Sequence, residues 1–505
     1  MTLPAFLPFQ KQLPHRFSLH GLCMVVMACM LAAMAGCSSM APAYKRPDPP
    51  VARTWSTAPP EADSVSVRGL TWDTYFHDPE LTRLISTALK NNRDLRMALL
   101  RVDEARSAYR IQRSERFPQI SATGQGARAR LPADLSPTGQ AVTGSEYRTE
   151  LGLTTWELDL WGRVYSLESA ALESWLATEA ARQAVRVALI AEVANSYLML
   201  RELDERVQIL RKSVESRQTS YRIFQRRYEV GSTSKLDVTQ VQTLLTQAQT
   251  LLAQLEQQRD VQQNALRLLI GSEPDLQEEH GSLSRTTTLA PLAPGLPAEL
   301  LTNRPDIIAA EHRLRAANAN IGAARAAFFP RIALTGSFGS ASTELDSLFR
   351  SGSRAWTFVP TVSLPIFDSG RRRAELELSE IRRDMAVAGY EQTIQNAFRE
   401  VADALSTAHW LRQQLDVQLT GREAQTERAR LAQLRYDNGS ATYLEVLDAE
   451  RNLLDAEQQV VQTRRAMLSN QVALFSALGG GADLSSPAVQ TDTGQEHSTQ
   501  PQQRP

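Results

Sequence analysis

The fold is decided by a six-residue stretch that occurs twice, as Arg227-Tyr228-Glu229-Val230-Gly231-Ser232 and again as Arg435-Tyr436-Asp437-Asn438-Gly439-Ser440. The two glycines are 208 positions apart, and Leu236-Asp237-Val238 and Leu444-Glu445-Val446 keep the same offset. Self-similarity at so long a period indicates a duplicated half-protein rather than a solenoid. Each stretch separates two long helical patterns, and its glycine permits the positive φ with which a helix ends and the chain reverses. The sequence therefore predicts two tall antiparallel helix hairpins.

An N-cap signal follows each of these turns. Ser234-x-x-Asp237 and Thr442-x-x-Glu445 both match the capping-box pattern, in which two side chains satisfy free N–H groups at a helix start. We expect both boxes to begin the returning helices.

Composition excludes several classes of function. The chain has 505 residues, a formal net charge of -1 and interspersed charges, so no basic surface indicates nucleic acid binding. It has no phosphate-binding glycine loop and no nucleophile elbow, and its seven histidines show no metal-ligand spacing. We therefore expect no enzyme, no cofactor and no metal site.

The N-terminus has the pattern of a targeting signal. Lys11 and Arg16 precede an uncharged run over 17–43, within which Met34-Ala35-Gly36-Cys37 resembles a bacterial lipoprotein signal. We predict a signal peptide over 1–36 and acylation of Cys37 after cleavage.

The predicted cleavage also settles the cysteine chemistry. Cys23 and Cys29 would leave with the signal peptide, so the mature chain would hold no disulfide, zinc site or thiol nucleophile. Ser38 follows the acylated cysteine where an Asp would indicate inner-membrane retention in the lipoproteins that this segment resembles, which favours the outer membrane. Residues 37–71 are rich in Pro, Ala and Ser at first and predict an extended, lipidated tether.

Two similar halves follow the tether. In the first half, 72–271, we expect a helix over 79–115, strands over 120–126 and 147–160, and a helix over 163–228 that returns over 234–270. A connector rich in proline spans 272–303. The second half, 304–480, repeats the plan with a helix over 305–328, strands over 332–338 and 356–366, and helices over 370–436 and 442–478. The tail, 481–505, is polar and predicts disorder.

Paired apolar residues distinguish the last helix. They recur every seven residues as Val446/Leu447, Leu453/Leu454, Val460/Val461, Met467/Leu468 and Leu474/Phe475. Adjacent residues lie about 100° apart on a helix, so such pairs can contact neighbours on two sides, as in a cylinder of helices. An ordinary bundle helix with a broad apolar stripe is the alternative. The rods of roughly 65 residues, or ~100 Å, and the strands spliced into each half favour the cylinder.

The predicted strands have the length that crosses an outer membrane when tilted. Two pairs per chain cannot close a barrel with an aqueous lumen, and open edges cannot face lipid. If these are membrane strands, the chain must oligomerise. Two soluble β-hairpins are the alternative.

Six motifs carry a resemblance to a known family. They are Pro42-Ala43-Tyr44-Lys45-Arg46-Pro47, Phe76-His77-Asp78-Pro79-Glu80-Leu81, Trp156-Glu157-Leu158-Asp159-Leu160-Trp161-Gly162-Arg163, Leu296-Pro297-Ala298-Glu299-Leu300-Leu301, Arg304-Pro305-Asp306-Ile307 and Ala326-Ala327-Phe328-Phe329-Pro330. With them the chain resembles the outer-membrane efflux channels of the TolC and OprM class, in their lipoprotein branch, over nearly all of the mature chain.

The resemblance implies a mainly α fold with a membrane β-barrel. Three copies would each give four strands to one shared barrel, and their hairpins would form an α-helical barrel in the periplasm. It implies a lipid-anchored outer-membrane channel that passively exports drugs or other small toxic compounds. It also implies two partners, a periplasmic adaptor (membrane fusion) protein and an inner-membrane pump of the RND type.

The resemblance further implies roles for particular residues. Tyr436, Glu445 and Asp448 are similar in placement to positions that constrict the periplasmic mouth, and Asp237 to a position in the network that holds it closed. Repeated by threefold symmetry, the acidic residues would form rings that favour cations. Ala441 replaces the basic partner of some relatives. Capping is the alternative role for Glu445 and Asp237.

The turns themselves are candidates for contact with the adaptor. The residues concerned are Val230, Gly231, Ser232, Asn438, Gly439 and Ser440. Arg371-Arg372-Arg373 begins a helix, where it fits either a solvated charged face or contact with phospholipid.

Two other classes of protein fit the sequence less well. A periplasmic coiled-coil adaptor, often a lipoprotein, has one hairpin, and the duplicated plan argues against it. No motif supports a cell-envelope enzyme.

Overall fold

The computed structural model describes residues 39–52, 54–55, 65–66, 70–137, 139–274, 283, 292–295 and 299–482. The signal peptide, Cys37 and most of the predicted tail lie outside them. The chain divides into two compact units. The first contains the described residues of Met1–Arg46, Arg106–Ser174 and Leu314–Ala386, and the second those of Pro47–Ala105, Trp175–Arg313 and Val387–Pro505.

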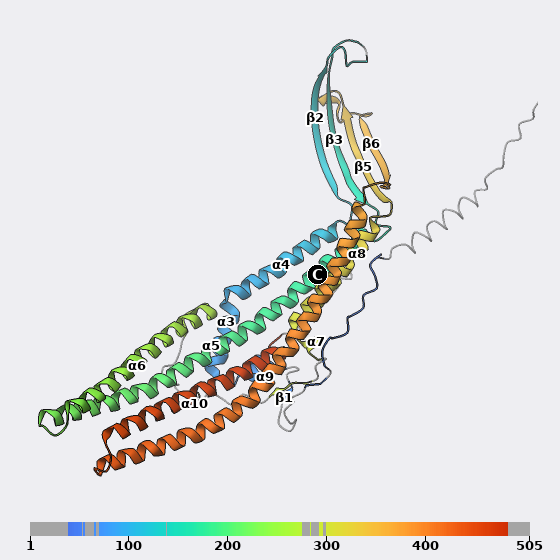
Figure 1. Ribbon diagram of the computed structural model, residues 1–505. Coiled ribbons are helices and arrows are strands. Elements are labelled where there is room, and N and C mark those ends of the chain that lie inside the picture. Colours follow the sequence, from blue (N-terminus) through green and yellow to red (C-terminus); the bar gives the residue numbers. More distant parts are fainter. Residues whose placement is uncertain are drawn as a thin grey trace, which may run out of the picture. The chain divides into compact units, whose positions relative to one another are not determined.

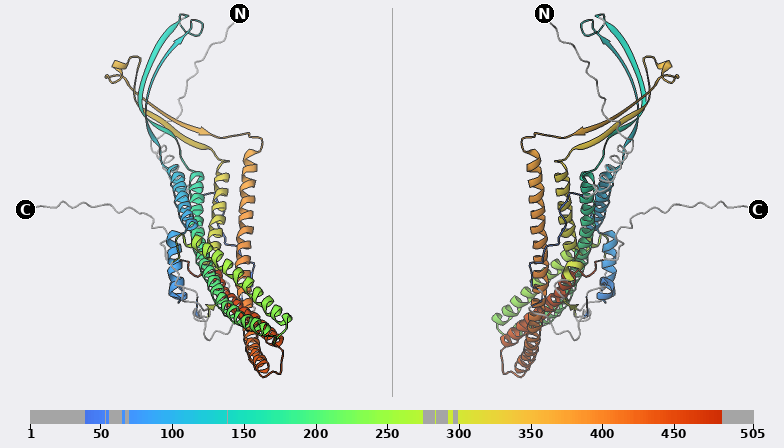
Figure 2. Two further views of the ribbon diagram at one scale, coloured as in Figure 1. Left: turned by 90° about the vertical axis from the view of Figure 1, so that its left-hand side faces the viewer. Right: turned by 90° about the vertical axis from the view of Figure 1, so that its right-hand side faces the viewer.

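The first unit contains a four-stranded antiparallel sheet (Figure 1). Its strands are β2 (Ile120–Leu131), β3 (Val142–Glu157), β5 (Arg331–Ser342) and β6 (Arg354–Ser363). They are ordered β2-β3-β5-β6, so the strand pairs of the two sequence halves join through β3 and β5. The two strand pairs diverge towards their loops (Figure 2), and the register between β3 and β5 begins only at Tyr147 and Ser342.

Three prolines lie at or near the margins of this sheet. Pro118 and Pro330 precede β2 and β5, as the sequence predicts. Pro360 lies inside β6, opposite Leu334, where a residue without an N–H is tolerated because β6 is an edge strand. The expected start of the second strand, at Tyr147, was wrong: pairing continues to Val142, opposite Leu131.

Two helix hairpins form most of the second unit (Figure 1). The first consists of α5 (Arg163–Glu229) and α6 (Lys235–Ile270), the second of α9 (Arg371–Asp437) and α10 (Tyr443–Ala477). α5 and α9 both have 67 residues and both begin in the first unit. The predicted helix bounds are confirmed to within one or two residues.

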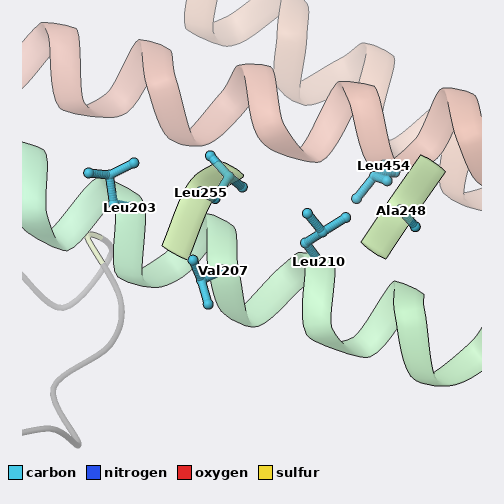
Figure 3. Packing of buried hydrophobic residues seen from close by; sticks show 6 residues of the cluster. All are labelled: Leu203, Val207, Leu210, Ala248, Leu255 and Leu454. Carbon is cyan, nitrogen blue, oxygen red and sulfur yellow. The ribbon is translucent and has the colours of Figure 1, made fainter. Parts of the chain in front are cut away.

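The core between the hairpins draws on both of them. In Figure 3 three residues of α5, two of α6 and one of α10 form one apolar cluster: Leu203, Val207, Leu210, Ala248, Leu255 and Leu454. Burying each of the five leucine and valine side chains stabilises the fold by roughly 1.5–3 kcal/mol. The second hairpin therefore shares the core of the first.

The adjacent apolar residues of α10 contact different neighbours. Val446 packs with Ala432 of α9, whereas Leu447 packs with Phe224 of α5 and Val238 of α6. The predicted two-sided packing of this helix is confirmed here.

The helix expected over 79–115 is broken in two, which corrects the sequence interpretation. α3 (Pro79–Asn91) and α4 (Arg93–Ser114) are separated by Asn92, whose backbone is extended. The Asn92 Oδ1 accepts a hydrogen bond from the Leu95 N–H at 2.9 Å, and its Nδ2 donates to the Leu269 carbonyl at 2.9 Å. One buried amide thus caps a helix and ties it to α6, which apolar periodicity does not reveal.

Several short elements complete the described chain and were not predicted as such. They are β1 (Val65–Ser66), α2 (Trp72–Tyr75), β4 (Leu292–Ala293), α7 (Leu300–Asn303) and η3 (Leu345–Ser347). β1 and β4 pair in parallel. α8 (Pro305–Ala326) agrees with the helix expected there.

The segment 39–46 is extended, but it is not a free tether. Asn318 of α8 donates a hydrogen bond from Nδ2 to the Pro42 carbonyl at 2.8 Å. The expected tether is therefore held against the first unit at these residues, because the Pro42 carbonyl finds a partner on α8.

Among the described helices, none has an apolar stretch long enough to cross a membrane.

Candidate functional site

The two hairpin tips share one backbone structure. Gly231 and Gly439 have φ values of 78° and 70°. At the first tip the N–H groups of Gly231 and Ser232 donate to the carbonyls of Tyr228 and Arg227 at 2.9 and 2.8 Å. The second tip repeats both bonds at 2.9 Å, 208 positions later. This pair of bonds is the Schellman motif, which satisfies the last carbonyls of α5 and α9.

The first tip also contains the predicted capping box. The Ser234 Oγ accepts a hydrogen bond from the Asp237 N–H at 3.1 Å, and Asp237 accepts from the Ser234 N–H at 3.1 Å. The hydroxyls of Ser234 and Thr233 donate to the same carboxylate at 2.7 and 2.9 Å. These hydrogen bonds lower the pKa of Asp237. All four bonds remain within the first tip, so the proposed link from Asp237 to the mouth network stays a prediction.

The second tip lacks the capping box, which corrects the sequence interpretation. The Thr442 side chain makes no cap bond at the start of α10. The Glu445 carboxylate instead accepts from Arg435, which also donates to the Ser440 carbonyl at 3.3 Å. A guanidinium is a charged donor and competes effectively with a backbone N–H for the carboxylate.

Asp448 lies between two arginines. Its carboxylate forms ion pairs with Arg428 of α9 and Arg451 of α10, each at 2.6 Å. The Asn452 Nδ2 donates to it at 3.2 Å. Glu445 is paired as well, so both acids have arginine partners within one copy of the chain; the cation-favouring rings stay a prediction.

Tyr436 connects the second tip to the first hairpin. Its hydroxyl accepts a hydrogen bond from Arg227 of α5, and the Arg227 guanidinium lies 5.8 Å from the centre of its ring. The Tyr436 ring lies 4.9 Å from that of Tyr443, whose hydroxyl bonds Ser220 of α5 at 2.6 Å. The structure thus brings Tyr436 into a cross-hairpin contact that the sequence did not predict.

Sequence reasoning missed the arginines of this site. Arg435 and Glu445 face each other across a turn, a pairing for which helical spacing gives no signal. Arg451 follows Asp448 by three residues, the spacing at which helical side chains meet, and this pair was readable.

A buried cation between the hairpins was also missed. Arg217 of α5 is 5% exposed, and it donates from Nη1 to the Leu244 carbonyl of α6 at 2.9 Å. Burial lowers the pKa of Arg217. Burial also raises the pKa of Glu450 on α10, and the positive charge of Arg217 partly offsets that rise. A charged position inside an apolar stripe was the available signal.

The turn residues expected to contact an adaptor are at the surface. Val230 is 75% exposed, and the apolar side chains of Leu236 and Leu444 beside the turns are exposed too. Ser232 and Ser440 each use the hydroxyl to bond the carbonyl of the arginine five residues earlier, at 2.9 Å. Each tip therefore presents a rigid, partly apolar surface.

The sheet of the first unit has one apolar and one polar face. Register and alternation place one row on the first face: Ala122, Leu151, Phe338 and Trp356. The next row lies on the second face: Ser121, Gly152, Ser337 and Thr357. The hydroxyls of Ser337 and Thr357 lie 3.0 Å apart, whereas Leu151, Phe338 and Trp356 expose more than half of their surfaces. Exposed apolar rows of this kind indicate a further surface or lipid against them.

Comparison with known proteins covers both halves of the chain. The family model described as "Outer membrane efflux protein" matches residues 84–272 and 296–480. The outer membrane protein OprJ of Pseudomonas aeruginosa is 45% identical over 464 residues, which cover 91% of this chain and 96% of OprJ. The solvent efflux pump outer membrane protein SrpC of Pseudomonas putida is 43% identical over 460 residues, 90% of this chain and 97% of SrpC.

The fold has a similar counterpart among solved structures. The open state of the MtrE outer membrane channel of Neisseria gonorrhoeae matches with a TM-score of 0.81 and 36% sequence identity. The match covers 88% of this chain and 99% of MtrE.

Proposed function

The chain belongs to the outer membrane efflux protein family, and from this premise we propose that it is the outer-membrane channel of an efflux system. It exports small toxic compounds passively, from the periplasm to the outside. The observation that carries this conclusion is the family match to both halves of the chain, together with relatives named as outer membrane efflux proteins. SrpC is named for solvent efflux, which makes apolar organic compounds the substrate class to test first.

The working form of the channel is a homotrimer. The sheet has an apolar face, a polar face and two edge strands, β2 and β6. In a bilayer, unpaired edges in hydrocarbon cost several kcal/mol for each group. Pairing β2 of one copy with β6 of the next closes both edges, apart from the one N–H that Pro360 lacks, and it places the apolar rows against lipid and the polar rows around water. Three copies of four strands make a barrel wide enough for a lumen.

Family membership also underlies the proposed lipid anchor and the proposed protein partners. Cys37 carries the lipid, and the protein extends from the outer membrane into the periplasm. A periplasmic adaptor contacts the exposed tips, and an inner-membrane pump of the RND type supplies the energy. Val230 and Leu444, both exposed, offer the adaptor apolar contacts.

The second tip acts as the periplasmic gate. Three arginines hold Glu445 and Asp448, and Arg227 holds Tyr436. Such contacts on exposed side chains are worth at most about 1 kcal/mol each, so a docking partner can exchange them for its own. The resemblance places Asp237 in the network that closes the mouth as well. Because its four hydrogen bonds all stay within its own turn, we assign it instead to the rigidity of the first tip.

Conductance of the acylated, detergent-purified protein in planar bilayers tests the function directly. A channel gives discrete conductance steps whose number grows with the protein added. An adaptor lipoprotein, the alternative expected from the sequence, gives none. Absence of steps from a stable trimer that reaches the outer membrane would overturn the channel assignment.

A further inference from the structure

The segment after the predicted acylation site lies in a fitted notch of the first unit. The Ala41 N–H donates to the Ser39 Oγ at 3.1 Å, and the Ser39 and Ser166 hydroxyls lie 2.8 Å apart. Ser166 of α5 is fully buried, and its Oγ donates to the Gly162 carbonyl at 2.5 Å. With that proton committed, Ser39 must be the donor to Ser166. The result is a continuous chain of hydrogen bonds from the segment into the first turn of α5.

α8 closes the other side of the notch. A Cβ on Gly322 would lie 2.7 Å from the Ala41 nitrogen and 2.6 Å from the Ser166 Oγ, closer than such atoms approach. Asn318, one turn earlier, donates to the Pro42 carbonyl at 2.8 Å. One further turn back, the guanidinium of Arg315 lies 5.1 Å from the centre of the Tyr44 ring, a cation–π distance.

We propose that Gly322, Ser166, Asn318 and Arg315 form a binding seat for residues 39–44, and that this seat fixes the point at which the lipid anchor leaves the protein. Its occupant is this chain's own post-cysteine segment. The anchoring role rests on the proposed acylation of Cys37, whereas the seat itself does not.

The seat changes what the anchor does. Ser39 lies two positions after Cys37, and a chain of that length spans at most about 7 Å. If the whole expected tether were flexible, the distance between the lipid and the folded protein could vary over tens of ångströms. A seated segment instead delivers the acyl chains beside the first turn of α5, close to the end of β3. The lipid then restricts the orientation of the sheet relative to the bilayer surface.

A disulfide test reads the seat directly in the full-length, acylated protein. Ser39→Cys with Ser166→Cys places two thiols where the hydroxyls are 2.8 Å apart, within the reach of a disulfide. Ser39→Cys with Ser174→Cys is the matched control, since Ser174 lies eight residues or about 12 Å further along α5. We expect about tenfold more linked peptide from the first pair after mild oxidation, measured by mass spectrometry. Equal yields from the two pairs would refute the seat.

A glycine substitution tests its shape. Gly322→Ala is combined with Ser39→Cys and Ser166→Cys. It adds the Cβ that the docked segment excludes, so the yield of disulfide-linked peptide should fall to that of the control pair. Gly421→Ala is the matched variant, because a Cβ there meets nothing within 4 Å, and it should keep full linkage. Full linkage in Gly322→Ala would contradict the proposal.

Asn318→Ala covers the case in which Gly322→Ala fails to fold. It removes the bond to Pro42 without adding bulk, and we expect linkage to fall several-fold in a protein that keeps its helix content. Unchanged linkage in Asn318→Ala would count against the seat. Peptide mapping distinguishes a loss of the disulfide between positions 39 and 166 from a failure of acylation. If Cys37 is not acylated, its free thiol can form a disulfide with position 166, and the linked peptide then contains Cys37. Conductance is not a readout of this test, so its result is independent of the channel assignment.

Discussion

At the first tip Asp237 bonds the serine of its own turn, whereas at the second the equivalent residue, Glu445, bonds Arg435. The backbones that carry these residues are alike, down to the same two hydrogen bonds and the same positive φ. Arg227 occupies in the first half the position of Arg435 in the second, yet it reaches out to Tyr436 of the other hairpin. Duplication has therefore kept the turn and changed the side chains. At the first tip the acid bonds its own turn, whereas at the second tip the acids and Tyr436 are held by arginine contacts that can exchange.

The largest expected effect concerns the core that joins the two tips. Leu447 of α10 is 3% exposed and packs against α5 and α6. Leu447→Ala should cost about 2–5 kcal/mol of stability, because it removes buried methyl groups and leaves a cavity. Thermal unfolding followed by circular dichroism measures the loss.

Leu444→Ala is the control for that variant. Leu444 is 55% exposed one turn earlier on the same helix, so its truncation should change stability by less than about 0.5 kcal/mol. Equal losses from the two variants would mean that Leu447 does not join the hairpins.

The shared backbone predicts equal effects at the two glycines. A Cβ on Gly231 or Gly439 meets nothing within 4 Å, so Gly→Ala at either position probes the positive φ alone. Each substitution should cost about 1–2 kcal/mol. Chemical denaturation of the two variants compares them. A difference as large as the effect itself would show that the tips do not share one turn.

The capping residues should separate the tips. Ser234→Ala removes a capping bond and should cost about 1 kcal/mol. Thr442→Ala removes none and should cost only a few tenths. Hydrogen exchange at the first turns of α6 and α10 measures the two losses separately. Equal fraying of both helices would show that Thr442 caps α10 as Ser234 caps α6, contrary to the structure.

The smallest effect is the pH dependence that Asp237 contributes at the first tip. Hydrogen bonds from Ser234 and Thr233 lower the pKa of Asp237, so its contribution to stability is present above its unfolded pKa and is lost as pH falls through the folded value. The stability difference between the protein and Asp237→Asn should therefore be constant near pH 7 and shrink below about pH 4. A difference that grows on acidification would reverse the sign of the assigned shift.

Most of the backbone could be predicted from the sequence, because helix length, strand alternation and the two glycines depend on local chemistry. The two-sided packing of Val446 and Leu447 was predictable for the same reason. The site was less so. Whether Glu445 caps a helix or bonds Arg435 depends on a cation ten residues away, across a turn. The break at Asn92 depends on a carbonyl of α6 that lies far away in sequence.

Single-channel conductance of Glu445→Ala with Asp448→Ala, set against Asp237→Ala, tests most directly whether the second tip alone holds the mouth closed. The double variant loses the arginine pairs of the second tip, each worth at most about 1 kcal/mol. Its channel openings should become roughly fivefold more frequent, or the conductance of each opening should rise. Asp237→Ala should conduct as the unmodified protein does. Unchanged conductance in the double variant, or an equal rise in Asp237→Ala, would contradict the account.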